Sequence, residues 1–111
     1  MNSEFFNRLL IRILKENDSE LMENAAFVLG DIGPEAKAAV PDLLLLLQGT
    51  DSNLRAIAAS SLGKIHVEPK TVAPALVAAL RDADPSVRAS AANALKYFPA
   101  AARQVIPALI D

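Results

Sequence analysis

Apolar and polar residues along this chain follow the period of an α-helix. The positions Leu54, Ile57, Ala58 and Leu62 lie three or four residues apart, which places them on one helical face. A second stripe of this kind is formed by Val40, Leu43, Leu44 and Leu47. The pattern therefore predicts an all-α protein built from amphipathic helices.

The same pattern returns at a constant shift of 33 residues, without a gap. Six columns of this alignment hold identical residues. They are Asp18, Asp51 and Asp84; Ala25, Ala58 and Ala91; Ala26, Ala59 and Ala92; Leu29, Leu62 and Leu95; Pro41, Pro74 and Pro107; and Leu43, Leu76 and Leu109. A period of this length is typical of stacked repeats, each of which is one supersecondary unit.

Each repeat is interpreted as two helices. The aspartate column supplies the N-cap of the first helix, because a carboxylate accepts bonds from the unpaired N–H groups of the first turn. We expect Gly30 and Gly63 to end the first helices of their units, since glycine adopts the left-handed C-cap conformation at little cost. The expected first helices span 19–29, 52–62 and 85–96, and the second helices span 35–48, 69–81 and 101 to the chain end.

The proline column lies in the second helix and allows two interpretations. A helix that begins near residue 35 contains Pro41 in its interior and is kinked there. A helix that begins near Val40 carries Pro41 in its first turn, where the missing N–H costs nothing. We favour the kinked helix.

The paired alanines of the first helices, such as Ala58 and Ala59, indicate close contact between neighbouring units. Small side chains allow two helices to approach, and alanine has the highest helix propensity. A lone helix pair cannot bury its apolar face, so neighbouring units must cover it.

Composition narrows the class of protein further. The chain of 111 residues is 52% hydrophobic and 22% charged, which is typical of a folded domain. The net charge of -2 argues against general nucleic-acid binding, and the lack of cysteine excludes disulfides and thiolate metal sites. No apolar run approaches the roughly 20 residues that cross a bilayer, and the N-terminal segment does not have the pattern of a signal peptide. We expect a cytoplasmic protein without a cofactor.

The segment from Asp51 to Ile65 resembles a HEAT repeat, in particular the short variety found in phycobilisome lyases. The likeness lies in Asp51-Ser-Asn-Leu-Arg55, Ala58-Ala59 and Leu62-Gly63-Lys-Ile65, and it extends from about residue 17 to the chain end. The resemblance implies a right-handed α–α superhelix, a HEAT or armadillo-like solenoid of about three and a half repeats, with the second helices on its concave side. Met22 and Lys96 depart from the pattern, because the other units carry arginine and glycine there.

The resemblance implies a class of functions and does not select one. HEAT-like arrays mostly bind proteins, whereas some relatives attach or detach bilin chromophores and others are parts of enzymes. The leading hypothesis is a non-catalytic scaffold that binds another protein or a peptide. The alternative is a fragment or subunit of an enzyme such as a bilin lyase.

The two ends of the array are expected to differ. Residues 1–16 match a second helix without its first and have a more polar surface, as a capping helix needs, and the repeats span 17–49, 50–82 and 83–111. The last helix, with Val105, Ile106, Leu109 and Ile110, has no polar cap after it. The chain is therefore interpreted as a fragment of a longer array, or as one whose last unit rests on a partner or on another copy.

The candidate binding surface is a ridge on the concave side of the expected solenoid, formed by the sides of the second helices that point away from the core. It is low in charge, and Leu45 is a large apolar side chain that the helical pattern turns toward solvent. One interpretation is a groove for an extended peptide or a helix; the other is that small residues are needed where kinked helices crowd. The ridge consists of Ala38, Asp42, Leu45, Thr71, Ala75, Ala78, Gln104 and Ala108.

Two charged columns admit a structural and a functional interpretation. Arg55 and Arg88 form either an anion site or a ladder of ion pairs with the aspartates Asp51 and Asp84, and the ladder is favoured. A thin basic stripe could touch phosphates or the propionates of a bilin, although acidic residues lie close by and a solvated flank is favoured. The stripe consists of Lys37, Lys70 and Arg103.

His66 is the single histidine of the chain. It lies in a turn between two helices, without the second histidine or serine–aspartate pattern that a metal site or a catalytic triad needs. We expect a solvated loop residue. The acidic residues of the connecting turns, such as Asp82 and Asp84, are expected to cap helices, so the sequence contains no catalytic or metal-ligating candidate.

Overall fold

The computed structural model describes residues 3–101 and residue 103. These residues form helices and contain no β-strand, which confirms the predicted all-α class. The α-helices are α1 (Ser3–Leu14), α2 (Ser19–Ile32), α3 (Val40–Leu47), α4 (Ser52–Ile65), α5 (Pro69–Ala79) and α6 (Pro85–Ala94). There are two 3-10 helices in the element order: η1 (Gly33–Ala39) joins α2 to α3, and η2 (Leu95–Tyr97) follows α6.

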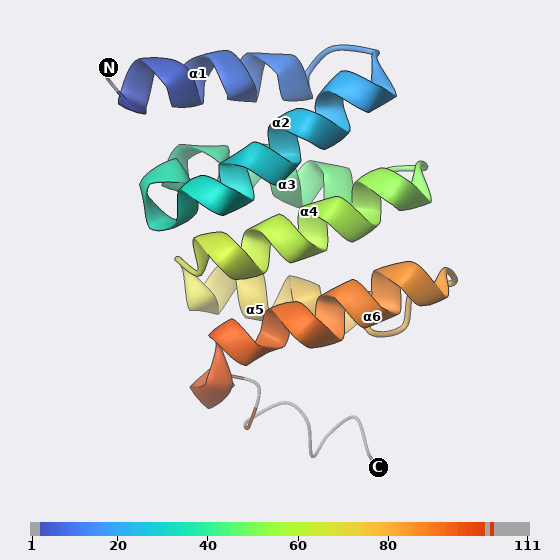
Figure 1. Ribbon diagram of the computed structural model, residues 1–111. Coiled ribbons are helices and arrows are strands. Elements are labelled where there is room, and N and C mark those ends of the chain that lie inside the picture. Colours follow the sequence, from blue (N-terminus) through green and yellow to red (C-terminus); the bar gives the residue numbers. More distant parts are fainter. Residues whose placement is uncertain (1–2, 102, 104–111) are drawn as a thin grey trace.

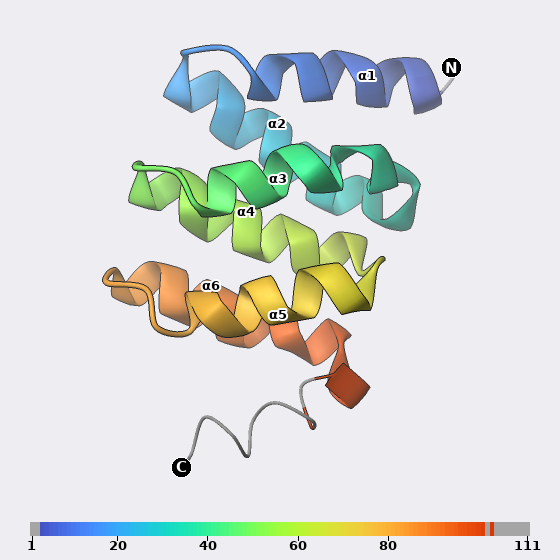
Figure 2. The same cartoon turned by 180° about the vertical axis from the view of Figure 1, so that it is seen from behind.

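The helices form two layers. The first helices α2, α4 and α6 stack side by side, with α4 in contact with both of its neighbours (Figure 1). The second helices α3 and α5 lie behind them, and α1 lies at the N-terminal end of the stack (Figure 2). With principal extents of 46 × 26 × 16 Å, the molecule is elongated, as expected of a solenoid in which each unit contacts only its neighbours.

The aspartate column begins the first helices as predicted. The Oδ1 atom of Asp18 accepts a hydrogen bond from the N–H of Leu21 at 3.2 Å, and that of Asp51 accepts one from Asn53 at 2.9 Å. Asp84 caps α6 in the same way through the N–H of Ser86. Each such cap stabilises its helix by about 1 kcal/mol.

The expectation that Gly30 and Gly63 end their helices is wrong. Both lie inside helices, because α2 continues to Ile32 and α4 to Ile65. A Cβ atom on Gly30 would lie 3.0 Å from the Cα atom of Ser61, and one on Gly63 would lie 2.6 Å from the Cβ atom of Ala94. These glycines are therefore required by the close approach of successive first helices, not by a turn.

The proline column behaves differently in the two units that the structure describes. In the first unit the favoured kinked helix is wrong, since α3 begins at Val40 and carries Pro41 in its first turn. Ala36 in η1 has non-helical backbone angles (φ −88°, ψ 20°), which separates η1 from a regular α-helix. In the second unit Pro74 lies inside α5, as the favoured interpretation requires. Pro107 lies outside the described residues.

The core runs along the contact between the two layers. The alanine columns are buried at Ala25, Ala26, Ala58 and Ala59, and Ser61 of α4 donates a hydrogen bond of 2.6 Å to the carbonyl oxygen of Ala26 in α2. This buried bond ties successive first helices together at the level of the glycine contacts. The predicted helix–helix role of the alanines is therefore confirmed for these units.

Candidate protein-binding surface

The predicted ridge lies on the second-helix layer, and the structure leaves most of it accessible. Leu45 on α3 is 69% exposed, the highest value among the large apolar side chains of the described residues. Ala38, Thr71 and Ala78 are exposed, and Asp42 and Ala75 are half-buried. Gln104 and Ala108 lie outside the described residues.

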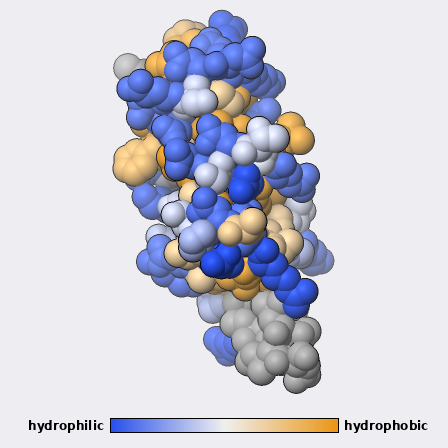
Figure 3. All heavy atoms as spheres, turned by 90° about the vertical axis from the view of Figure 1, so that its right-hand side faces the viewer, coloured by the Kyte–Doolittle hydropathy of each residue, from blue (hydrophilic) through white to orange (hydrophobic). Residues whose placement is uncertain are grey.

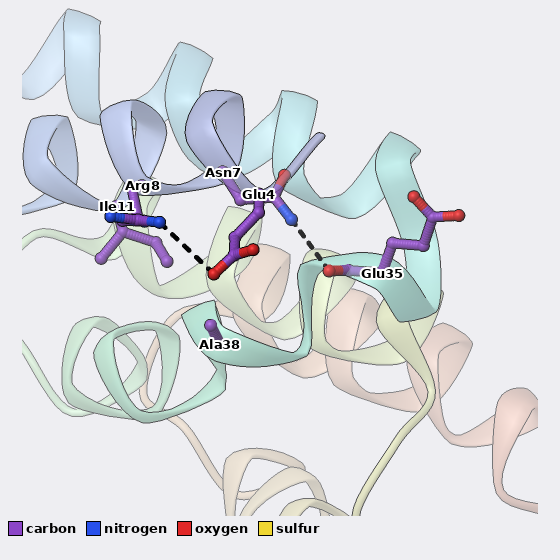
Figure 4. Close-up of a pocket in the computed structure, with 6 residues that line it drawn as sticks. All are labelled: Glu4, Asn7, Arg8, Ile11, Glu35 and Ala38. Carbon is purple, nitrogen blue, oxygen red and sulfur yellow. Dashed lines mark hydrogen bonds and ion pairs between the residues drawn. The ribbon is translucent and has the colours of Figure 1, made fainter. Parts of the chain in front are cut away.

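Two hollows adjoin the ridge. The larger one, about 560 Å³, lies between α1 and η1, where Glu4 and Arg8 of α1 face Ala38 (Figure 4). The smaller one, about 180 Å³, lies between α3 and α5 and is lined in part by Ala75 and Ala78. Three residues of the ridge therefore line hollows between successive second helices, which the sequence did not reveal.

Asn7 fixes one wall of the larger hollow. Its side chain is buried, and its Nδ2 atom donates a hydrogen bond of 2.8 Å to the carbonyl oxygen of Glu35 (Figure 4). This bond joins α1 to η1. The Oδ1 atom of Asn7 is buried and accepts no hydrogen bond among the described residues.

The expected polar surface of the N-terminal helix is only partly present. Phe5 on α1 is 58% exposed, and Leu9 is also exposed. In the 33-residue register Phe5 corresponds to Ala38 and Thr71, and Leu9 corresponds to Asp42. The apolar surface therefore continues from the ridge onto α1. The register itself would have identified both residues.

The side that carries the α1–α2, α3–α4 and α5–α6 connections is different. It is mainly hydrophilic, with scattered apolar atoms (Figure 3).

Lys37 and Lys70 of the predicted basic stripe are exposed, as is Arg103. The stripe thus lies at the surface.

The predicted arginine ladder is present among the described residues as a single ion pair, that of Arg55, and its acidic partner is not the predicted one. Arg55 forms a two-pronged ion pair with Asp82, with Nε to Oδ2 at 2.9 Å and Nη2 to Oδ1 at 3.1 Å. Its Nη1 atom donates to the carbonyl oxygen of Gly49, and Arg88 donates in the same way to the carbonyl oxygen of Asp82. Asp51 is engaged in capping α4. Each arginine thus holds the connection before its own helix, and Arg55 also holds the connection of the next unit.

The hydrogen bonds of this network stabilise the charged forms of its side chains, and the pKa values shift accordingly. The hydrogen bonds from Arg55, followed by the N–H of Asp84, lower the pKa of Asp82. The N–H of Ser86 is the main cause that lowers the pKa of Asp84. The bond to Asp82 raises the pKa of Arg55. The guanidinium group of Arg55 is already paired with the carboxylate of Asp82. The arginine column is therefore better suited to a structural role than to binding an anion.

His66 is an exposed residue of the connection between α4 and α5, as expected, but it makes two contacts that the sequence did not predict. It is the C-cap of α4 and has a left-handed backbone (φ 39°). Its Nδ1 atom lies 2.8 Å from the carbonyl oxygen of Lys64, and its ring stacks on Tyr97 with centroids 5.9 Å apart. The histidine therefore connects the end of α4 to η2. Local sequence spacing could not predict the stacking, because Tyr97 lies 31 residues further along the chain.

The part of the chain that the structure describes contains neither a metal site nor a membrane-spanning helix. There is no cluster of histidine, cysteine, aspartate or glutamate residues that could hold a metal ion. None of the described helices combines the length and apolar character that a membrane span requires.

A two-layer stack of repeated helix pairs with a hollowed second-helix layer defines an α-solenoid repeat protein. A sequence model of HEAT repeats matches residues 7–96 and again residues 40–111. Because these matches cover nearly the whole chain, the protein belongs to the HEAT repeat family. No curated protein matches the sequence. HEAT repeats are typical of protein-interaction scaffolds, and the family is usually non-catalytic.

Proposed function

We propose that this chain is a protein-binding scaffold whose partner lies along the second-helix layer. The observation that carries the proposal is the exposure of Leu45, a large apolar side chain on α3, the helix that forms one wall of the hollow lined by Ala75 and Ala78. Burying a leucine side chain contributes about 1.5–3 kcal/mol, so such a residue is a natural anchor for a partner.

The surrounding surface fits a peptide with large apolar side chains. The small residues Ala75, Ala78 and Ala79 line the hollow between α3 and α5 and leave room for a side chain from outside. Phe5 and Leu9 extend the apolar surface onto α1. A segment lying across α1, α3 and α5 would contact all of these residues, so we expect an extended peptide or a helix that crosses the layer.

The proposal is tested with peptides selected from a random display library on the immobilised 111-residue chain. The dissociation constant is then measured for the wild type and for two variants. Leu45→Glu should weaken binding at least tenfold, because a charge would have to be buried. Phe27→Glu is the matched control, since Phe27 is also an exposed apolar side chain but lies on α2 in the other layer. Binding that survives Leu45→Glu, or a library that yields no binder, would contradict the proposal.

The alternative function is that of a fragment or subunit of a bilin lyase, and it rests on the resemblance alone. An experiment with a free bilin can distinguish it from the scaffold function. A free bilin would need cations for its propionates, and the exposed Lys37 and Lys70 are the candidates. Titration of the chain with a free bilin is followed by visible absorbance. A spectral change that is lost in a Lys37→Glu/Lys70→Glu variant would favour the lyase alternative over the scaffold.

A further inference from the structure

The first helices of the solenoid have two covered sides in the interior of the stack, but α2 has only one. Helix α4 packs against α2 on one side and α6 on the other. No first helix precedes α2 in the described residues, so the side of α2 that faces away from α4 is covered only in part, by α1 (Figure 1).

The exposure of equivalent residues demonstrates this open side. Leu21 on α2 is 44% exposed, whereas its equivalents Leu54 and Val87 are 7% and 0% exposed. Val28 and Ile32, about two and three helical turns further along α2, are half-buried. The equivalent residues of the next two units are buried; they are Ser61, Ala94, Ile65 and Phe98. The open face of α2 therefore carries three apolar side chains that are more exposed than their equivalents in the next two units.

Helix α1 contributes a second part of the same face. Phe6 is 37% exposed, while the equivalent residues Ala39 and Val72 are fully buried. Ala39 belongs to η1, which packs against the first helix of its own unit, α2. Phe6 has no such helix beside it in the described residues. The open faces of α1 and α2 together form the place of one additional first helix.

The interior of the stack shows what kind of helix fits this place. Where α4 covers α6, it presents the small residues Ala59 and Gly63, one turn apart, and Gly63 lies directly against Ala94. The residue of α2 that would meet the glycine of an additional helix is Val28, in the column of Ser61 and Ala94. A helix with alanine and glycine at this spacing can approach, whereas one with large residues cannot.

Charge specifies the occupant further. Residues 16–36 contain six acidic residues and no lysine or arginine. Glu16 lies in the column of Asp82, which accepts both prongs of Arg55 from the preceding first helix. An arginine at the equivalent position of an added helix would find Glu16 in the place of Asp82, and Glu20 beside Leu21 strengthens the negative potential.

We propose that the open face of α1 and α2 binds an amphipathic helix of a partner protein, with alanine and glycine on its apolar side and an arginine that pairs with Glu16. The helix lies parallel to α2 and continues the first-helix layer by one member. A second copy of this chain fits less well, because its last unit carries Lys96, in η2, where α2 and α4 carry Gly30 and Gly63.

The probe is a synthetic peptide with the sequence of residues 50–66 of this chain, held helical by a crosslink on the side away from Ala59 and Gly63. Its affinity for the complete chain is measured by calorimetry at low and high salt. We expect saturable binding that weakens with salt, because the Arg55–Glu16 pair is partly exposed to solvent. Leu21→Glu in the chain, and Gly63→Leu in the peptide, should each weaken binding at least tenfold.

Charge exchange tests the predicted register. Glu16→Arg in the chain should weaken binding several-fold, and Arg55→Glu in the peptide should restore it. Leu45→Glu in the chain should leave the affinity unchanged, which separates this face from the second-helix layer of the proposed function. Circular dichroism of each variant establishes that the chain remains folded.

Three outcomes would overturn the inference. They are failure of the helical peptide to bind, binding that survives Leu21→Glu, and loss of affinity in both charge variants without restoration. Sedimentation of the chain alone distinguishes the other occupant. If the chain associates with itself and Leu21→Glu abolishes the association, the face binds a second copy and not a partner helix.

Discussion

The helices of the first layer approach each other more closely than those of the second, and the difference separates the stability of the fold from the recognition that we propose. In the first layer, Gly63 lies against Ala94 and Ser61 bonds to α2 across a buried contact. In the second layer, α3 and α5 are separated by a hollow, and Leu45 is exposed to solvent. Changes in the first layer should therefore alter the free energy of unfolding, and changes in the second layer should alter binding.

A large loss of stability is expected from a bulky residue at the tightest contact of the first layer. Gly63→Leu would force α4 and α6 apart, since even a Cβ atom there would lie 2.6 Å from that of Ala94. Overpacking of this kind should cost about 3 kcal/mol in the free energy of unfolding, measured by urea denaturation. Ala78→Leu, on the exposed side of α5, is the matched control and should change it by less than about 0.5 kcal/mol. Equal effects would show that the layers do not differ.

A smaller loss is expected when the bond between the first helices is removed. Ser61→Ala deletes the donor to the carbonyl oxygen of Ala26 and should cost about 1 kcal/mol, because a buried hydrogen bond is lost. Ser60→Ala is the control, since Ser60 is adjacent, half-buried and makes no side-chain hydrogen bond among the described residues. If both variants unfold at the same urea concentration, the Ser61 bond does not hold the layer together.

The contrast between the layers was only partly predictable from the sequence. The repeated columns predict the helix pairs and their stacking, because a constant shift without gaps places equivalent residues in equivalent environments. The glycines were misinterpreted because both a C-cap and a close helix contact favour glycine. The apolar spacing that continues from Leu29 to Ile32 and from Leu62 to Ile65 indicates that the helices extend past them.

The partners of the charged residues depend on how consecutive units stack, which local spacing does not determine. Asp51 lies one helical turn before Arg55 and is the obvious partner in the sequence, but it caps α4. Asp82 lies 27 residues away and is brought to Arg55 by the stacking of the two connections. The ridge was predicted from the helical pattern alone, whereas the hollows beside it depend on the spacing of α1, α3 and α5.

The Arg55–Asp82 pair makes the stability of the fold depend on pH. We expect its contribution to the free energy of unfolding to be smaller than that of the Ser61 bond. The pKa of Asp82 is lowered in the folded state, so its contribution to stability is present above the unfolded pKa of about 3.9 and is lost as the pH falls through the folded value. Asp82→Asn should therefore flatten the decline of the free energy of unfolding between about pH 5 and pH 2.5.

Urea denaturation at a series of pH values measures this slope. Asp42→Asn on α3 is the control, because Asp42 makes no ion pair among the described residues and belongs to the second layer. Asp84, whose pKa is also lowered, remains in both variants and leaves part of the decline in place. An Asp82→Asn curve parallel to that of the wild type would show that the pair is not linked to folding.

The smallest expected effect on stability is at Leu45, and it is compared with that at Leu43 two residues earlier on α3. Leu45 is 69% exposed and Leu43 is fully buried. Leu45→Glu removes little buried area and adds a solvated charge, so the free energy of unfolding should change by less than about 0.5 kcal/mol. Leu43→Glu places a carboxylate in the core between the layers and should prevent folding or cost more than about 4 kcal/mol. Thermal denaturation followed by circular dichroism compares the two directly. A strong destabilisation by Leu45→Glu would mean that this leucine belongs to the core, and that any loss of binding in the same variant reflects unfolding and not a partner contact.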